Sequence, residues 1–129
     1  VFSWLPSIGI TDIEFLNSVK LGDKYVNNMF VGDIGDLTNG YLYYFEVNED
    51  RTGIKFDSNS NSNSSSSSSQ TGLTDLVADN EQEMSAIALG TDFGGITDIE
   101  TGPDGFLYIL TLDRESDGEG KIYRITQLL

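Results

Sequence analysis

Short apolar and aromatic runs, separated by turn residues, dominate the chain and predict β-strands. In Ile10–Leu16, apolar residues alternate with Asp12 and Glu14, as in a strand with two different faces. Asn39-Gly40 predicts a tight hairpin turn, and Gly102–Gly105 (Gly-Pro-Asp-Gly) predicts another turn. The predicted strands are residues 10–16, 29–33, 41–47, 54–56 (a short edge strand), 95–100, 106–112 and 120–125.

One segment, Leu73–Leu89, fits two structures. Its apolar residues could line one face of a helix, and Met84–Leu89 could equally form a strand that ends at Gly90. The spacing alone leaves both alternatives open.

The hexapeptide Gly-Ile-Thr-Asp-Ile-Glu occurs twice, at Gly9–Glu14 and at Gly95–Glu100. Each copy is followed by two further strand-like runs in the same order. Such self-similarity indicates two copies of one structural unit, each built from three or four strands.

The run Phe106–Leu112 is apolar at every position except Thr111. In an antiparallel sheet this predicts burial on both faces, which requires further sheets on both sides. Radial stacking of small sheets provides this in a β-propeller, whose blades span about 40–45 residues. The sequence therefore predicts an all-β fold with about two adjacent four-stranded antiparallel blades of a propeller, forming a partial ring. Blade one is expected at about 8–57 plus 84–90, and blade two at about 95–127.

Between these parts, residues 58–69 are only Ser and Asn. Such a tract cannot bury enough apolar surface to offset the loss of chain entropy. We expect residues 58–72 to form a disordered insertion in a surface loop.

Composition narrows the possible functions. The formal charge is −14, which argues against nucleic acid and anionic membranes as partners. No apolar run is long enough to cross a membrane. The chain contains neither Cys nor His, so thiolate metal sites and the most common general base are both missing.

Four motifs, taken in order, resemble the glucose/sorbosone dehydrogenase family, soluble sugar dehydrogenases that depend on pyrroloquinoline quinone (PQQ). They cover nearly the whole chain outside the Ser/Asn tract. The motifs are Trp4-Leu5-Pro6-Ser7-Ile8; Phe30-Val31-Gly32-Asp33 with Asn39-Gly40-Tyr41-Leu42-Tyr43; Thr97-Asp98-Ile99-Glu100 with Gly102–Leu110; and Gly120–Ile125.

The resemblance implies a six-bladed propeller of which this chain is the C-terminal third, beginning within a longer protein. It implies PQQ and calcium as cofactors of the parent protein, an aldose as substrate, and an extracellular or periplasmic location. The catalytic base of the family is a His in an earlier blade, so this chain would carry no catalytic residue. Its partner would be the remainder of its own propeller, and Trp4 and Pro6 would line the substrate pocket.

One departure concerns the cofactor. PQQ-binding members of the family have an Arg-x-Arg-Asp stretch where this chain has Gly95-Ile96-Thr97-Asp98. Gly95 and Thr97 therefore match the two cofactor-binding positions, but neither carries a charge. Two charge-assisted hydrogen bonds are worth roughly 1.5–3 kcal/mol each, so their loss would weaken PQQ binding by orders of magnitude.

Two further segments have an ordinary and a functional interpretation. The loop Asp33–Asn39 matches a segment that reaches toward the cofactor in the family, but its Asp and Asn residues favour a simple turn. Asp113, Glu115 and Asp117 alternate before a glycine, as at the start of a calcium loop. The Glu that should close such a loop is replaced by Arg124, which favours a solvated hairpin.

The missing arginines leave a second function open, namely a non-catalytic propeller that binds a protein or a glycan. A third and weaker alternative is a free-standing acidic β domain.

Overall fold

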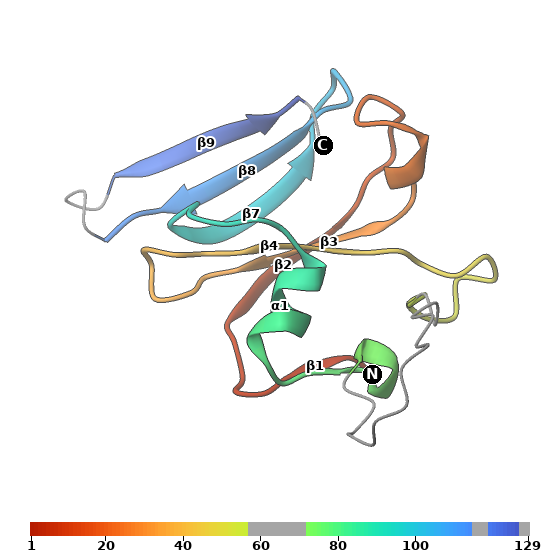
Figure 1. Ribbon diagram of the computed structural model, residues 1–129. Coiled ribbons are helices and arrows are strands. Elements are labelled where there is room, and N and C mark those ends of the chain that lie inside the picture. The colour runs from red at the N-terminus through yellow and green to blue at the C-terminus, as the bar shows by residue number, and fades with distance from the viewer. Residues whose placement is uncertain (57–71, 115–118, 127–129) are drawn as a thin grey trace.

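The computed structural model describes residues 1–56, 72–114 and 119–126, and these residues are mostly β (Figure 1). They contain a four-stranded antiparallel sheet in the order β2-β3-β4-β6 and a three-stranded antiparallel sheet in the order β7-β8-β9. The two sheets, called the first and second sheet below, do not close into a ring within the described residues. Their strands are β2 (Ile10–Phe15), β3 (Met29–Asp33), β4 (Leu42–Phe45), β6 (Ala88–Gly90), β7 (Gly95–Thr101), β8 (Leu107–Leu112) and β9 (Gly120–Ile125).

The two copies of the hexapeptide form the first strands of separate sheets, β2 and β7. In both strands the register shifts at the same place, between Ile10 and Asp12 in β2 and between Ile96 and Asp98 in β7. The prediction of two similar antiparallel units is confirmed at this level.

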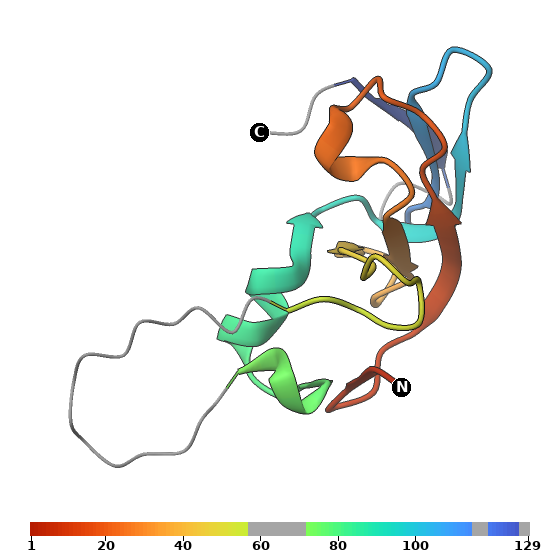
Figure 2. The same ribbon diagram turned by 90° about the vertical axis from the view of Figure 1, so that its right-hand side faces the viewer.

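A small layer covers one face of the first sheet. It contains β1 (Ser3–Trp4) and β5 (Val77–Ala78), which pair in parallel, and the 3-10 turn η2 (Leu73–Asp75), which contacts β5. A second 3-10 turn, η1 (Asp23–Tyr25), lies between β2 and β3 along the chain. The helix α1 (Glu81–Ile87) completes this layer; it lies below the strands of the first sheet in Figure 1 and to their left in Figure 2. The ambiguous segment therefore contains a helix followed directly by a strand. The side chain of Asn80 accepts a hydrogen bond from the Glu83 amide and so fixes where the helix begins.

Two hydrophobic clusters lie on the opposite faces of the first sheet. One fills the space between the two sheets, with Phe30, Leu42, Ile96, Ile99 and Ile109 all buried. The other packs the first sheet against the layer of β1, β5 and α1, and its buried members are Val31, Tyr43, Phe45, Ala78 and Ile87. Because residues alternate between the faces of a strand, β3 and β4 supply both clusters.

Two sequence expectations are wrong for the described residues. The strand β8 is buried on one face only, because Leu110 and Leu112 are 42% and 39% exposed and no described segment packs over them. The expected strand at 54–56 is reduced to a single bridge between Val47 and Ile54. The predicted disordered insertion lies outside the described residues except for Gly72, and the expected boundaries of the two blades are not tested.

Candidate functional site

The loops at the ends of β2, β3 and β7 converge into one cluster, which contains Gly95 and the 33–39 loop, two of the places that the family resemblance singles out. The amide of Ile34 donates to the Gly9 carbonyl at 2.8 Å, and the amide of Gly40 donates to the Gly94 carbonyl. The amide of Arg114 donates to the Leu37 carbonyl at 3.2 Å. The segments around residues 9, 34–40, 94–95 and 113–114 are thus held together by backbone hydrogen bonds.

Gly95, one of the two predicted cofactor positions, lies buried beneath the 34–40 loop. A Cβ atom built on Gly95 would lie 2.7 Å from the Leu37 side chain and 2.9 Å from the Ile34 carbonyl oxygen. No larger residue fits here without moving backbone atoms. This position is therefore closed to a cofactor-binding side chain.

Thr97, the other predicted cofactor position, is half-buried, and its hydroxyl donates to the Leu110 carbonyl at 3.1 Å within its own sheet. A neutral hydroxyl already used in this way offers no charge to an anionic ligand. The two positions thus lie near each other on one strand, but neither supplies the guanidinium that quinone carboxylates require.

The 34–40 loop is organised by its own acidic side chains. Asp33 accepts from the Gly35 amide at 2.9 Å, and Asp36 accepts from the Thr38 amide at 3.0 Å and from the Thr38 hydroxyl. The hydrogen bond from the Thr38 side chain is the main reason that the pKa of Asp36 is lowered. These are the hydrogen bonds of an ordinary turn, as its composition predicted.

Asp33, which the sequence assigned to a simple turn with the rest of the 33–39 loop, is the most unusual carboxyl in the cluster. Its residue is only 4% exposed, and burial raises its pKa, whereas hydrogen bonds from the Gly35 and Gly9 backbone act in the opposite direction. Its charge also contributes, after burial, to raising the pKa of Tyr43.

Trp4, predicted to line the substrate pocket, contributes to a small apolar cavity on the other face of the first sheet. The cavity has a volume of about 220 Å³ and is lined by Phe2, Trp4, Ile10, Ile13, Met29, Val31, Phe45 and Ile54. Pro6 is exposed and is not part of this lining. The indole ring of Trp4 packs edge-on against Phe2 and Phe45.

The cavity offers few of the hydrogen-bonding groups that a sugar needs. Its lining side chains are hydrocarbon or thioether, apart from the indole nitrogen of Trp4. That nitrogen and the hydroxyl of the neighbouring Tyr43 are buried and have no hydrogen-bond partner within the described part of the chain. A hydroxylated ligand needs several such groups, so the cavity suits an apolar side chain better.

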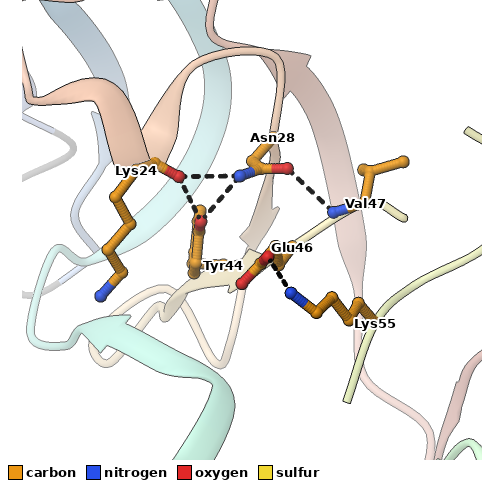
Figure 3. A network of polar contacts seen from close by, with 6 residues as sticks. All are labelled: Lys24, Asn28, Tyr44, Glu46, Val47 and Lys55. Atoms are coloured by element: carbon orange, nitrogen blue, oxygen red, sulfur yellow. Dashed lines mark hydrogen bonds and ion pairs between the residues drawn. The ribbon is translucent and has the colours of Figure 1, made fainter. Parts of the chain in front are cut away.

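At the other end of the strands, a polar network fixes η1 against β4 (Figure 3). The side-chain amide of Asn28 donates to the Lys24 carbonyl at 2.8 Å and to the Tyr44 hydroxyl at 3.0 Å, and its oxygen accepts from the Val47 amide at 2.9 Å. The Tyr44 hydroxyl donates in turn to the Lys24 carbonyl. The side-chain amide of Asn28 is thus engaged in holding the fold together, and the network serves structure.

The predicted calcium positions are only partly described. Asp113 forms an ion pair with Lys121 at 3.6 Å, which favours the interpretation as a hairpin. Glu115 and Asp117 lie outside the described residues. Among residues 1–56, 72–114 and 119–126, no group of three or more acidic side chains is arranged to hold a metal ion.

Comparison of the chain with protein-family models, with curated proteins and with solved structures gives no match in any of the three. In the part of the chain that the structure describes, no helix is both long and apolar enough to span a bilayer.

Proposed function

We propose that the chain forms two adjacent blades of a β-propeller that resembles the PQQ-dependent sugar dehydrogenases. In this proposal the chain supplies part of the wall around the axial pocket and not the catalytic base. The observation that carries it is the contact between β2 and β7. The equivalent first strands of the two sheets lie next to each other, as the innermost strands of neighbouring blades do, and side chains of β2 bind the backbone of β7.

The loop cluster around residues 34–40 and 94–95 would lie at the mouth of such a ring, where a ligand binds. The strands β2 and β7 both begin at this cluster, so their first residues lie at the same end of the two sheets. This agrees with the expected place of the cofactor site in the resembling family.

The residues present do not fit the quinone itself. Gly95 is sealed by Leu37 and Ile34, and Thr97 is neutral, so the expected clamp on the carboxylates is absent. We therefore derive no reaction step through PQQ or calcium. This misfit favours the second candidate, a propeller that binds a protein or a glycan without catalysis, and the apolar cavity beside Trp4 favours a protein over a glycan.

A titration of the chain with PQQ, in the presence and absence of calcium, separates the two candidates. Thr97→Arg restores a cation at the second family position, and Asn17→Arg makes the same charge change after the far end of β2. If the site is inherited from the dehydrogenases, Thr97→Arg binds PQQ at least about tenfold more tightly than Asn17→Arg does. Equal and negligible binding by both variants at micromolar PQQ removes the quinone part of the proposal.

A further inference from the structure

The two sheets meet at a joint in which β2 uses its side chains and β7 uses its backbone. The Asp12 carboxylate accepts from the Ile99 amide at 2.7 Å. Two residues further on, the Glu14 carboxylate accepts from the Thr101 amide at 3.0 Å and also from its hydroxyl. The two acidic side chains of the hexapeptide therefore cover the free edge of the next first strand.

Thr11 links the same two strands. Its hydroxyl lies 3.2 Å from the Gly32 carbonyl in its own sheet and 2.6 Å from the Ile96 carbonyl in the second sheet. In the second copy, the equivalent Thr97 keeps only the bond within its own sheet, to Leu110. The pairing register makes Leu110 the equivalent of Gly32, because they lie opposite Asp98 and Asp12 respectively.

In the second copy, Thr97, Asp98 and Glu100 are the equivalents of the three residues that form the joint. Within the described residues, no further strand lies against them in the way that β7 lies against β2. Asp98 and Glu100 are both exposed. Beside them the second sheet exposes an apolar surface formed by Leu110, Leu112 and Ile122, of which Ile122 is 71% exposed. The equivalent of Ile122 in the first sheet is Leu42, which lies buried between the sheets. We call this surface, formed by Thr97, Asp98, Glu100, Leu110, Leu112 and Ile122, the free acidic face.

The strand β2 exposes the residues that are equivalent to those that β7 contributes to the joint. Ile96 and Ile99 are 0% and 1% exposed in the joint, whereas their equivalents Ile10 and Ile13 are 38% and 51% exposed. Together with Phe15, these two residues form what we call the free β2 face. The apolar cavity of about 220 Å³ lies at this face, with Ile10 and Ile13 in its lining.

The backbone edge of β2 is also available. The amide of Leu16 donates to the Asn28 carbonyl, so this pair is hydrogen-bonded. Hydrogen-bonded and non-hydrogen-bonded pairs alternate along an antiparallel ladder. The amides of Ile13 and Phe15 therefore point away from β3, as those of Ile99 and Thr101 point away from β8 toward the acids.

We propose that the free acidic face of one chain docks the free β2 face of a second copy of this chain, head to tail. In this contact Asp98 accepts from the Ile13 amide of the second copy, and Glu100 accepts from its Phe15 amide. The internal joint is the template, and both halves come from the same hexapeptide. The inference goes beyond the proposed function and requires neither quinone nor sugar. A contact between two different surfaces leaves each dimer with one free acidic face and one free β2 face, so it leads to a ring or to a longer chain of copies.

Two features make this contact weaker than the internal joint. A Cβ atom on Gly32 would lie 2.6 Å from Ile96, so the internal joint depends on the absence of a side chain there. Leu110 occupies the equivalent position on the free acidic face and obstructs the incoming β2. The net charge of −14 also makes copies repel each other. Removal of the Leu110 side chain and addition of salt should both strengthen the association.

Sedimentation velocity on the full chain, at concentrations from about 10 µM to about 1 mM, tests the proposal. Four forms are compared, namely wild type, Leu110→Gly, Leu110→Gly with Asp98→Ala and Glu100→Ala, and Leu110→Gly with Asp23→Ala and Glu49→Ala. The last form makes the same charge change at two exposed acids away from the face. Circular dichroism of each form establishes that it is folded.

We expect weak association of the wild type that increases with salt, and at least about tenfold tighter association of Leu110→Gly. The Asp98/Glu100 variant should return to a monomer, and the Asp23/Glu49 control should not. Two results overturn the proposal. One is a folded Leu110→Gly chain that stays monomeric throughout the concentration range, and the other is equal association of the two double-acid variants. Neither result bears on PQQ binding, so failure here is distinct from failure of the proposed function.

Discussion

The two copies of Gly-Ile-Thr-Asp-Ile-Glu share a sequence and a local structure but differ in their surroundings. Both form a first strand with the same register shift, and in both the Thr hydroxyl binds a carbonyl of its own sheet. In β2 the isoleucines are exposed and the acids are bonded, whereas in β7 the isoleucines are buried and the acids are exposed. The comparison shows that the hexapeptide specifies the strand, while the neighbouring unit decides what each side chain does.

The largest effect should come from truncating the same residue in each copy. Ile99→Ala removes a buried side chain from the joint and should lower the free energy of unfolding by about 2–5 kcal/mol. Ile13→Ala, at an exposed position, should lower it by less than about 1 kcal/mol. Urea denaturation of both variants measures the difference. Equal destabilisation would mean that the two isoleucines are not in different environments.

A side chain added at the joint should have the next largest effect. Gly32→Ala places a Cβ atom within 2.6 Å of Ile96 and 3.2 Å of Ile99, so the two sheets must separate slightly. We expect a loss of about 1–3 kcal/mol in the free energy of unfolding. Gly72→Ala is the matched control, because nothing lies within 4 Å of its added Cβ atom. A Gly32 variant as stable as this control would contradict close packing of the sheets.

Removal of one acid from each copy tests the polar part of the comparison. Asp12→Ala leaves the Ile99 amide without its partner and should cost about 1–2 kcal/mol of unfolding free energy. Asp98→Ala removes an exposed side chain and, in dilute solution, should change stability by no more than about 0.5 kcal/mol. Thermal or urea unfolding of both variants gives the comparison, and a larger effect at Asp98 would be the contradictory result.

The smallest effect concerns Asp33. Burial raises the pKa of Asp33 in the folded state, so the folded chain binds this proton more tightly than the unfolded chain does. Ionisation of Asp33 therefore makes the wild type less stable as the pH rises from the ordinary carboxyl value of 3.8 through the raised folded pKa. Asp33→Asn cannot ionise and can still accept from the Gly35 amide.

The variant Asp33→Asn should accordingly be more stable than the wild type at neutral pH, and the advantage should disappear below about pH 4. Unfolding free energies measured at several pH values test this. A variant that is less stable at neutral pH would show that the Asp33 charge has a favourable partner.

Much of the fold could be predicted from the sequence because the strands have strong local signals. The strands at 29–33 and 120–125 were predicted with their observed bounds. Burial of β8 was predicted wrongly, because an apolar run shows that a strand can be buried but not that a neighbour is present. The helix at 81–87 could not be distinguished from a strand, because its identity depends on the Asn80 cap and on packing against the first sheet.

The candidate site was harder to predict. The family resemblance singled out Gly95 and the 33–39 loop separately, and nothing in the sequence indicated that Leu37 and Ile34 close over Gly95. The burial of Asp33 was not predicted, because burial of a carboxyl results from tertiary packing. The roles of Asp12 and Glu14 were also missed, since an acid that binds the backbone of another sheet has the same sequence pattern as a solvated one.

The most direct test of the joint is amide hydrogen exchange, followed by NMR in dilute solution. Because Asp12 and Glu14 cover the edge of β7, the amides of Ile99 and Thr101 should exchange at least about 100-fold more slowly than those of Ile13 and Phe15. In Asp12→Ala, the Ile99 amide should lose most of this protection while the strands of the second sheet keep theirs. Equal exchange of the two pairs in the wild type would contradict a joint formed by the first strands.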